Sequence, residues 1–249
     1  MQRYFVERSQ VDLANGLVRI TGDDVKHITR VLRMKPGDTV IVSDGCGTSC
    51  TVALKELQEF EVIGDIRHSL QSREPQVKIT LVQGLPKGDK MDLIVQKGTE
   101  IGVSEIIPVE TARSIVKYDE KKQTKAVERW RKIAKEAAEQ AHRDAIPAVQ
   151  RPQPLRQWMN KLSQYDLVLV PYEGEIVQTM QQILRTAGPI HRICIAIGPE
   201  GGWDDGEIAE FLALHAQPVT LGPRILRTET AGLVAAAVIL YEYGEMGGV

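Results

Sequence analysis

Two glycine-rich segments near the end of the chain are its best candidates for a ligand-binding site. Ile195–Trp203 is a buried-strand run that ends in a glycine-rich turn, and Leu221–Thr230 again leaves a strand and enters a helix. Glycine tolerates positive φ and has no side chain, so such turns let the backbone approach a ligand closely. Ligands of open α/β sheets collect at the carboxyl ends of strands, so two such turns favour one shared site. The alternative is that each turn merely ends a strand.

Other common catalytic signatures are absent from the sequence. It has neither a Gly-x-x-x-x-Gly-Lys-Ser/Thr loop nor a Gly-x-Gly-x-x-Gly turn after a strand, which argues against P-loop and classical dinucleotide chemistry. No Gly-x-Ser-x-Gly element indicates a hydrolase nucleophile. The histidines form no His-x-x-x-His pair, and Cys46 and Cys50 lack two further ligands nearby, so we expect no metal site.

Basic side chains gather in two places. Residues 117–143 carry nine basic and five acidic side chains. On a helix predicted after Thr21, the residues Lys26, Arg30 and Arg33 share a face at helical spacing. Such a face suits phosphate contacts, which position an RNA without reading its sequence. The alternative in both places is a solvated helix with ion pairs four residues apart.

The composition favours a cytoplasmic globular protein. Of the 249 residues, 43% are hydrophobic and 26% are charged, and the formal net charge is -2, so any RNA-binding surface must be local. The polar N-terminus shows no signal-peptide pattern, and the three cysteines suit a reducing compartment. The apolar run Ala231–Leu240 is about half of the ~20 residues that span a bilayer, so we expect a buried helix rather than a membrane anchor.

The elements that must position these residues fall into two patterns. The first 72 residues alternate polar and apolar side chains in short segments, which predicts a small β-barrel with one inserted helix that opens at a Thr21 capping box. After a polar linker, strands alternate with amphipathic segments, which predicts an α/β domain. Strands are expected at 76–84, 104–110, 166–172, 191–198 and 217–222, and helices at 89–103, 121–143, 155–162, 176–185, 205–214 and 228–243.

The two glycine-rich segments, the basic residues of the helix after Thr21 and several further segments along the chain together resemble the RsmE family. This family comprises the 16S ribosomal RNA (uracil-N3)-methyltransferases of the SPOUT superfamily. The chain departs from the family pattern at Ala141-His142, where a small residue and glycine are common, and at Trp203-Asp204. The matching segments are His27–Arg33 with Gly37-Asp38, Lys87–Met91 with Gln96–Gly102, Glu139-Gln140 with Arg143 and Pro147, Val170–Glu173, Ile197–Gly202 and Leu221–Ala231.

The resemblance implies an α/β protein with an RNA-binding PUA-like β-barrel at 1–72 and a SPOUT methyltransferase domain at 73–249 that ends in a trefoil knot. It implies S-adenosyl-L-methionine as cofactor, a cytoplasmic homodimer, and 16S ribosomal RNA within a small-subunit particle as partner, with no metal and no membrane. The cofactor-binding residues so implied are Val170, Pro171, Tyr172, Ile197, Gly198, Pro199, Glu200, Gly201, Gly202, Leu221, Gly222, Ile225, Leu226, Arg227, Thr228, Thr230 and Ala231. The RNA-binding residues are Arg3, His27, Arg30, Arg33 and Lys35.

The implied reaction sets the expected catalytic residues. Uracil N3 becomes nucleophilic only after its proton leaves, so positioning and electrostatics should carry most of the rate. We expect Arg143 and Arg227 to steer phosphate or the uracil oxygens, and Glu229 to orient the cofactor or help remove the proton. The alternatives are a non-catalytic RNA-binding ribosome assembly factor, and a phosphate-binding enzyme that uses Gly198–Gly202 as an anion nest.

Overall fold

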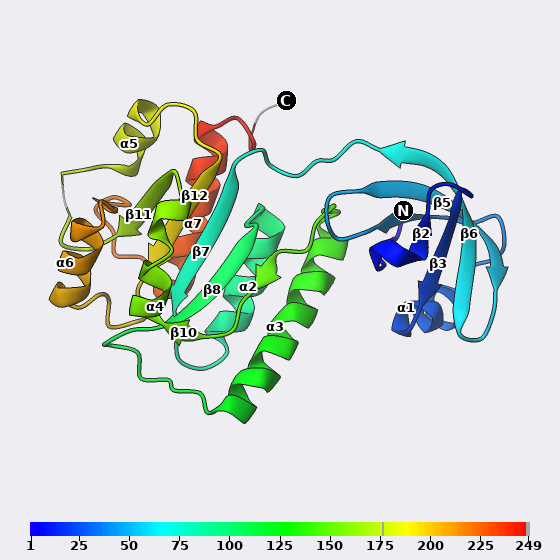
Figure 1. Ribbon diagram of the computed structural model, residues 1–249, viewed down its shortest axis with the longest axis horizontal. Coiled ribbons are helices and arrows are strands. Elements are labelled where there is room, and N and C mark those ends of the chain that lie inside the picture. Colours follow the sequence, from blue (N-terminus) through cyan, green and yellow to red (C-terminus); the bar gives the residue numbers. More distant parts are fainter. Residues whose placement is uncertain (176, 248–249) are drawn as a thin grey trace. The chain divides into compact units, whose positions relative to one another are not determined.

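The computed structural model describes residues 1–175 and 177–247 (Figure 1). Their contacts divide the chain into two compact units: residues 1–74 with 135–146, and residues 75–134 with the described residues from 147 onward. The long helix α3 (Glu120–Gln140) therefore contributes its beginning to the second unit and its end to the first. The chain has the mixed α/β character that its sequence predicts.

The first unit is built on a curled sheet with the strand order β1-β4-β5-β6-β3-β2. Strands β1 and β4 are parallel, and the other pairs are antiparallel. Alternate side chains point into one apolar cluster that includes Tyr4, Ile20, Val52 and Val62. The strands are β1 (Arg3–Phe5), β2 (Val11–Asp12), β3 (Leu17–Thr21), β4 (Thr39–Ser43), β5 (Ser49–Leu57) and β6 (Glu61–Leu70), with a 3-10 turn η1 (Arg8–Gln10) after β1.

The inserted helix of this unit is present, but it begins differently from the prediction. Helix α1 (Asp23–Lys26) continues directly into the π-helical turn η2 (His27–Val31). Gly22, with φ 75°, is the N-cap and provides no side-chain hydrogen bond. The predicted Thr21 capping box is therefore wrong. Thr21 is still the last residue of β3, and its Oγ1 accepts a hydrogen bond from Gln10 Nε2 at 2.8 Å.

The second unit holds a parallel sheet with the order β10-β8-β7-β12-β11-β13, to which β9 adds beside β8. All five predicted strands are confirmed, and the two short strands β9 and β10 were not anticipated. The strands are β7 (Lys78–Gly84), β8 (Glu105–Glu110), β9 (Ala148–Val149), β10 (Gln153–Pro154), β11 (Leu167–Pro171), β12 (Arg192–Ile197) and β13 (Gln217–Val219).

Helices cover both faces of this sheet. Trp158 and Phe211 join a buried cluster with Val82 and Val168 on one face, while α7 packs against the other. A Cβ at Gly232 would lie 2.9 Å from Leu81 Cδ1, so glycine lets α7 approach the sheet closely. The helices are α2 (Lys90–Ile101), α4 (Leu155–Met159), η3 (Leu162–Gln164), α5 (Met180–Thr186), α6 (Asp205–Ala213) and α7 (Thr228–Glu242).

The predicted helices are confirmed with shifted ends. The helix expected over 176–185 begins at Met180, and residue 176 lies outside the described residues. The apolar run near the C-terminus forms helix α7, which buries one face with Ala235, Ile239 and Leu240, while Val234 and Val238 stay partly exposed. Within the described part of the chain, no helix combines the length and the apolarity needed to cross a bilayer.

Candidate cofactor and active site

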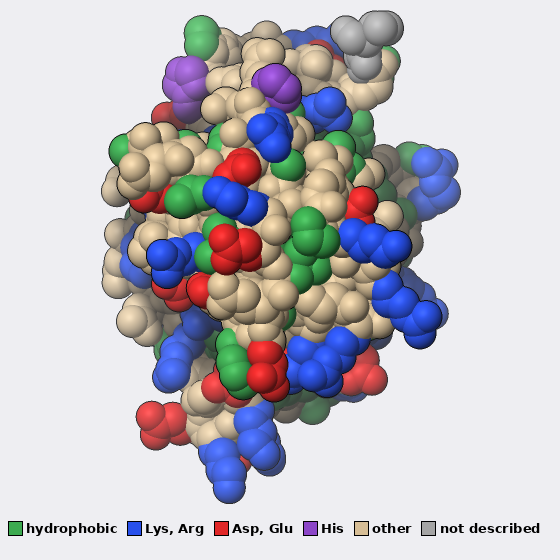
Figure 2. All heavy atoms as spheres, turned by 90° about the vertical axis from the view of Figure 1, so that its right-hand side faces the viewer, with side chains coloured by type: hydrophobic (Ala, Val, Ile, Leu, Met, Phe, Trp, Pro, Cys, Tyr) green, Lys and Arg blue, Asp and Glu red, His purple; other side chains and the backbone are tan. Residues whose placement is uncertain are grey.

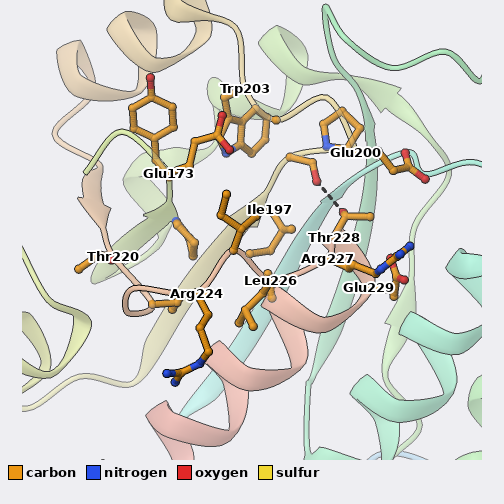
Figure 3. Close-up of a pocket in the computed structure, with 18 of the residues that line it drawn as sticks. Glu173, Ile197, Glu200, Trp203, Thr220, Arg224, Leu226, Arg227, Thr228 and Glu229 are labelled. Atoms are coloured by element: carbon orange, nitrogen blue, oxygen red, sulfur yellow. Dashed lines mark hydrogen bonds between the residues drawn. The ribbon is translucent and has the colours of Figure 1, made fainter. Parts of the chain in front are cut away.

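The two glycine-rich segments lie together in the second unit. Thr228, at the start of α7, is buried and donates a hydrogen bond from Oγ1 to the carbonyl oxygen of Gly198 at 2.6 Å, drawn in Figure 3. The same hydroxyl accepts from Gln83 Nε2 on β7 at 2.8 Å. One threonine thus ties the exits of two neighbouring strands to the beginning of α7.

These segments enclose a cavity of about 930 Å³. In Figure 3, Glu173 and Trp203 lie on one side of Ile197, and Glu200 and Glu229 lie on the other. Of the expected cofactor-binding residues, Val170, Gly201 and Thr230 do not line it. Those that do are Pro171, Tyr172, Ile197, Gly198, Pro199, Glu200, Gly202, Leu221, Gly222, Ile225, Leu226, Arg227, Thr228 and Ala231.

Glycine is required at two points of the first loop. A Cβ on Gly198 would lie 3.0 Å from the carbonyl carbon of Gly202, so the loop closes on itself only without a side chain there. Gly202 has φ 68°, a left-handed conformation that favours glycine. Gly201 differs, because its Cβ would meet Arg113 Cβ at 3.2 Å, and Arg113 Nη1 donates to its carbonyl oxygen at 2.9 Å. The residue therefore faces Arg113 rather than the cavity.

A lysine between two glutamates forms a charged cluster at the wall of the cavity. Lys90 Nζ lies 2.7 Å from Glu200 Oε1 and 3.6 Å from Glu229 Oε2. The hydrogen bond to Glu200 raises the pKa of Lys90. Burial by itself would raise the pKa of Glu200, but hydrogen bonds from Lys90 Nζ and from the Lys87 backbone N–H outweigh it and lower that pKa. Both groups are therefore charged at neutral pH.

Two polar atoms at the cavity have no hydrogen-bond partner among the described residues. They are Glu229 Oε2 and Trp203 Nε1, and both are buried. Trp203 is held by an edge-on contact with Phe211, with ring centroids 5.1 Å apart. Glu229 Oε2 has only the Lys90 ammonium near it, at 3.6 Å, and Trp203 Nε1–H has no acceptor, so both atoms keep hydrogen-bonding capacity that a ligand can use.

Two of the other expected residues belong to the first unit and are buried there. Arg143 donates from Nη2 to Glu74 Oε2 at 2.5 Å. Arg3, 4% exposed, pairs with Asp144 Oδ1 at 2.6 Å. The pKa of Asp144 is lowered although burial acts to raise it, because hydrogen bonds from Ser49, the Arg73 backbone N–H and Arg3 stabilise the carboxylate. Neither arginine lines the cavity, and both hold the end of α3 within the first unit.

The remaining predicted RNA contacts lie around η2. His27 is half-buried, with Nδ1 3.1 Å from Tyr4 Oη, whereas Arg30, Arg33 and Lys35 are exposed. The face shown in Figure 2 carries Lys and Arg side chains interspersed with Asp and Glu, in agreement with the small net charge. No single-sign patch dominates this face.

Sequence reasoning missed seven residues that line the cavity. Lys90 lies shortly after the carboxyl end of β7, so its position after a third parallel strand could have indicated that it lines the site. Trp203 follows the glycine turn directly, and Arg224 lies between two residues that were predicted. The seven are Lys90, Glu173, Glu175, Trp203, Thr220, Pro223 and Arg224.

Comparison with known proteins identifies the family. An RNA methyltransferase domain family matches residues 72–240, and an RNA methyltransferase PUA domain family matches residues 20–66. The chain is 39% identical to ribosomal RNA small subunit methyltransferase E of Bacillus subtilis, with 97% of each chain covered. The crystal structure of ribosomal RNA small subunit methyltransferase E from Neisseria gonorrhoeae bound to S-adenosyl methionine is similar with a TM-score of 0.81, 32% identity and 97% of each chain covered.

A Legionella pneumophila protein in complex with the bound cofactor SAM is similar as well, with a TM-score of 0.82, 30% identity and 96% of each chain covered. These matches agree with the resemblance found in the sequence. They extend over both the curled sheet and the parallel sheet, not over the glycine loops alone. The chain belongs to the ribosomal RNA small subunit methyltransferase E family of RNA methyltransferases.

Proposed function

We propose that this protein transfers a methyl group from S-adenosylmethionine to N3 of one uridine in 16S ribosomal RNA. The observation that carries this proposal is the cavity between the loops after β12 and β13, in a chain that belongs to an RNA methyltransferase family. The same loops carried the resemblance to the uracil-N3 enzymes.

The cavity suits S-adenosylmethionine in size, polarity and charge. Its volume of about 930 Å³ is in the range of small-molecule sites. Four carboxylates and three cationic side chains line it, which favours a ligand with a cationic sulfonium. Ile197 and Leu226 provide apolar surface for an adenine ring, and the unpaired Trp203 Nε1–H is available as a donor. The bound cofactor supplies an electrophilic methyl group.

The protein's own residues must position the uracil and remove its N3 proton. Arg227 is exposed at the start of α7 and lines the cavity, so we assign it to steering phosphate or the uracil oxygens. Glu229, in the first turn of α7, is assigned to accepting the N3 proton. Arg143 pairs with Glu74 in the first unit, and we assign it to holding the end of α3 there rather than to the reaction.

RNA recognition is assigned to the first domain. Arg30, Arg33 and Lys35 are exposed around η2, where they are available to phosphates, and His27 lies beside them in the chain. Arg3 is excluded from this role because its guanidinium pairs with Asp144 in the interior. We propose that 16S ribosomal RNA is bound within a small-subunit particle in the cytoplasm.

The architecture proposed for this function is a PUA-like barrel at 1–72 and a SPOUT domain at 73–249 whose C-terminal segment forms a trefoil knot. The Thr228 contact between the two loops supports a cofactor site inside that knot. A homodimer is proposed as well. Its support is an apolar stripe on α7, in which Val234, Val238 and Tyr241 are 37%, 37% and 67% exposed at helical spacing. Sedimentation at micromolar concentration tests the dimer.

Mass-spectrometric mapping of methylated bases tests the proposed reaction. Ribosomal RNA from a strain that lacks this protein should lose one N3-methyluridine, and the purified protein with S-adenosylmethionine should restore it. A complete set of N3-methyluridines in that strain would contradict the proposal. Calorimetry with S-adenosylmethionine tests the cofactor independently, because an assembly factor without catalysis does not require it.

A further inference from the structure

Lys90 connects the two cofactor loops through their acidic side chains. It begins α2, while Glu200 lies in the loop after β12 and Glu229 in the first turn of α7. Its ammonium is 2.7 Å from Glu200 Oε1 and 3.6 Å from Glu229 Oε2, and the three side chains are 29%, 30% and 15% exposed. The three groups therefore form one charged cluster at the cavity wall.

Among the cavity carboxylates Glu175, Glu200 and Glu229, Glu229 is the best placed to take a proton. Glu200 Oε1 already accepts from Lys90 Nζ and from the Lys87 backbone N–H at 3.0 Å. Glu175 Oε1 accepts from the backbone N–H groups of Val177 and Gln178 at 2.7 and 2.9 Å. Glu229 Oε2 is buried without a hydrogen-bond partner, and its ion pair with Lys90 Nζ is 3.6 Å long. A buried acceptor of this kind gains most from a donor such as the imide N–H of uracil.

We propose that Lys90 is a positioning residue that holds the Glu229 carboxylate toward the cavity, where Glu229 accepts the N3 proton of the target uridine. The inference rests on the proposed function. Glu229 takes the proton and the N3 lone pair remains on the base. That pair forms the new N–C bond while the S–C bond of the methyl donor breaks, with its electrons staying on sulfur. Glu229 afterwards releases the proton to solvent.

Lys90 has a second effect on the same step. Without its ammonium, two carboxylates would face each other across the space that it now bridges, and their repulsion would keep one of them protonated to a higher pH. The other charged side chains that line the cavity are Glu173, Glu175, Arg224 and Arg227.

The test compares Lys90→Met, Lys90→Arg and Glu229→Gln with the control Lys97→Met. Lys97 lies on the same helix, pairs with Glu100 at 2.8 Å and does not line the cavity. We expect Glu229→Gln to lower kcat at least about 100-fold, because general base catalysis contributes that much. Lys90→Met should lower kcat about tenfold and move the acidic limb of the kcat–pH profile upward by roughly one pH unit. Lys90→Arg should keep most of the wild-type kcat and most of the wild-type pH profile, and Lys97→Met should match the wild type in both.

Calorimetric titration of each variant with S-adenosylmethionine separates this inference from the proposed function. Unchanged cofactor affinity with reduced kcat in Lys90→Met supports it. An unchanged pH profile in Lys90→Met, or a loss confined to cofactor affinity or KM, would overturn the inference. Lys90 would then only connect the two loops. If the wild type neither binds S-adenosylmethionine nor methylates the RNA, the proposed function itself fails.

Discussion

Replacing Thr228 by valine tests the link between the two cofactor loops. Valine keeps the shape of threonine but removes the hydroxyl that donates to the Gly198 carbonyl at 2.6 Å and accepts from Gln83 Nε2 at 2.8 Å. The Gly198 carbonyl loses this donor, while Gln83 Nε2 keeps a bond to the Gly84 carbonyl at 3.0 Å. Since leaving a buried polar group without a hydrogen bond costs about 1–3 kcal/mol, we expect the free energy of unfolding to fall by about 2 kcal/mol.

Differential scanning calorimetry measures this loss directly. For a unit of this size, about 2 kcal/mol corresponds to a fall in Tm of about 4–8 °C. S-adenosylmethionine affinity should fall about tenfold, because the Gly198 turn is no longer fixed to α7. Thr228→Ser is the matched control: it keeps both hydrogen bonds and loses one methyl group, which costs about 1 kcal/mol. A serine variant as damaged as the valine variant would refute the hydrogen-bond argument, and so would a valine variant with wild-type Tm and affinity.

Three further predictions concern the first unit. Asp144→Ala should cost about 3–5 kcal/mol at neutral pH because it leaves the Arg3 charge buried and unpaired. Because the pKa of Asp144 is lowered in the folded state, this stabilisation is present above about pH 4 and is lost as the pH falls further. In urea titrations, the unfolding free energies of the variant and the wild type should therefore converge in acid. His142→Gly should stabilise the protein by about 1 kcal/mol and so raise the urea midpoint, because His142 has φ 55° at the end of α3, a left-handed conformation that favours glycine. A lower midpoint would show that this conformation does not strain His142. Arg30→Ala with Arg33→Ala should weaken RNA binding and reduce its log-log salt slope by roughly one per arginine, with unchanged S-adenosylmethionine affinity; an unchanged slope would remove these arginines from the RNA interface.

Local patterns in the sequence determined the elements and the main loops of the site. Strand β12 and its glycine turn were predictable because a run of apolar residues followed by Gly-Pro-Glu-Gly-Gly has few other solutions. Helix α7 was predictable for the same kind of reason, since its apolar run is too short for a membrane and too apolar for a surface. The position of both loops at the carboxyl ends of parallel strands followed from the α/β pattern.

Only the tertiary structure decided which distant residues meet. Arg3 looked like an RNA contact, but its partner Asp144 lies 141 residues away in the sequence, and no local pattern encodes that pairing. Lys90 is separated from Glu200 by 110 residues, and it reaches the cavity only because β7 lies beside β12 in the sheet. Thr21 is a residue type that often caps helices, but here it is the last residue of β3, and Gly22 takes the N-cap position instead. Propensity and periodicity act over a few residues, whereas ion pairs and cavity walls depend on the path of the whole chain.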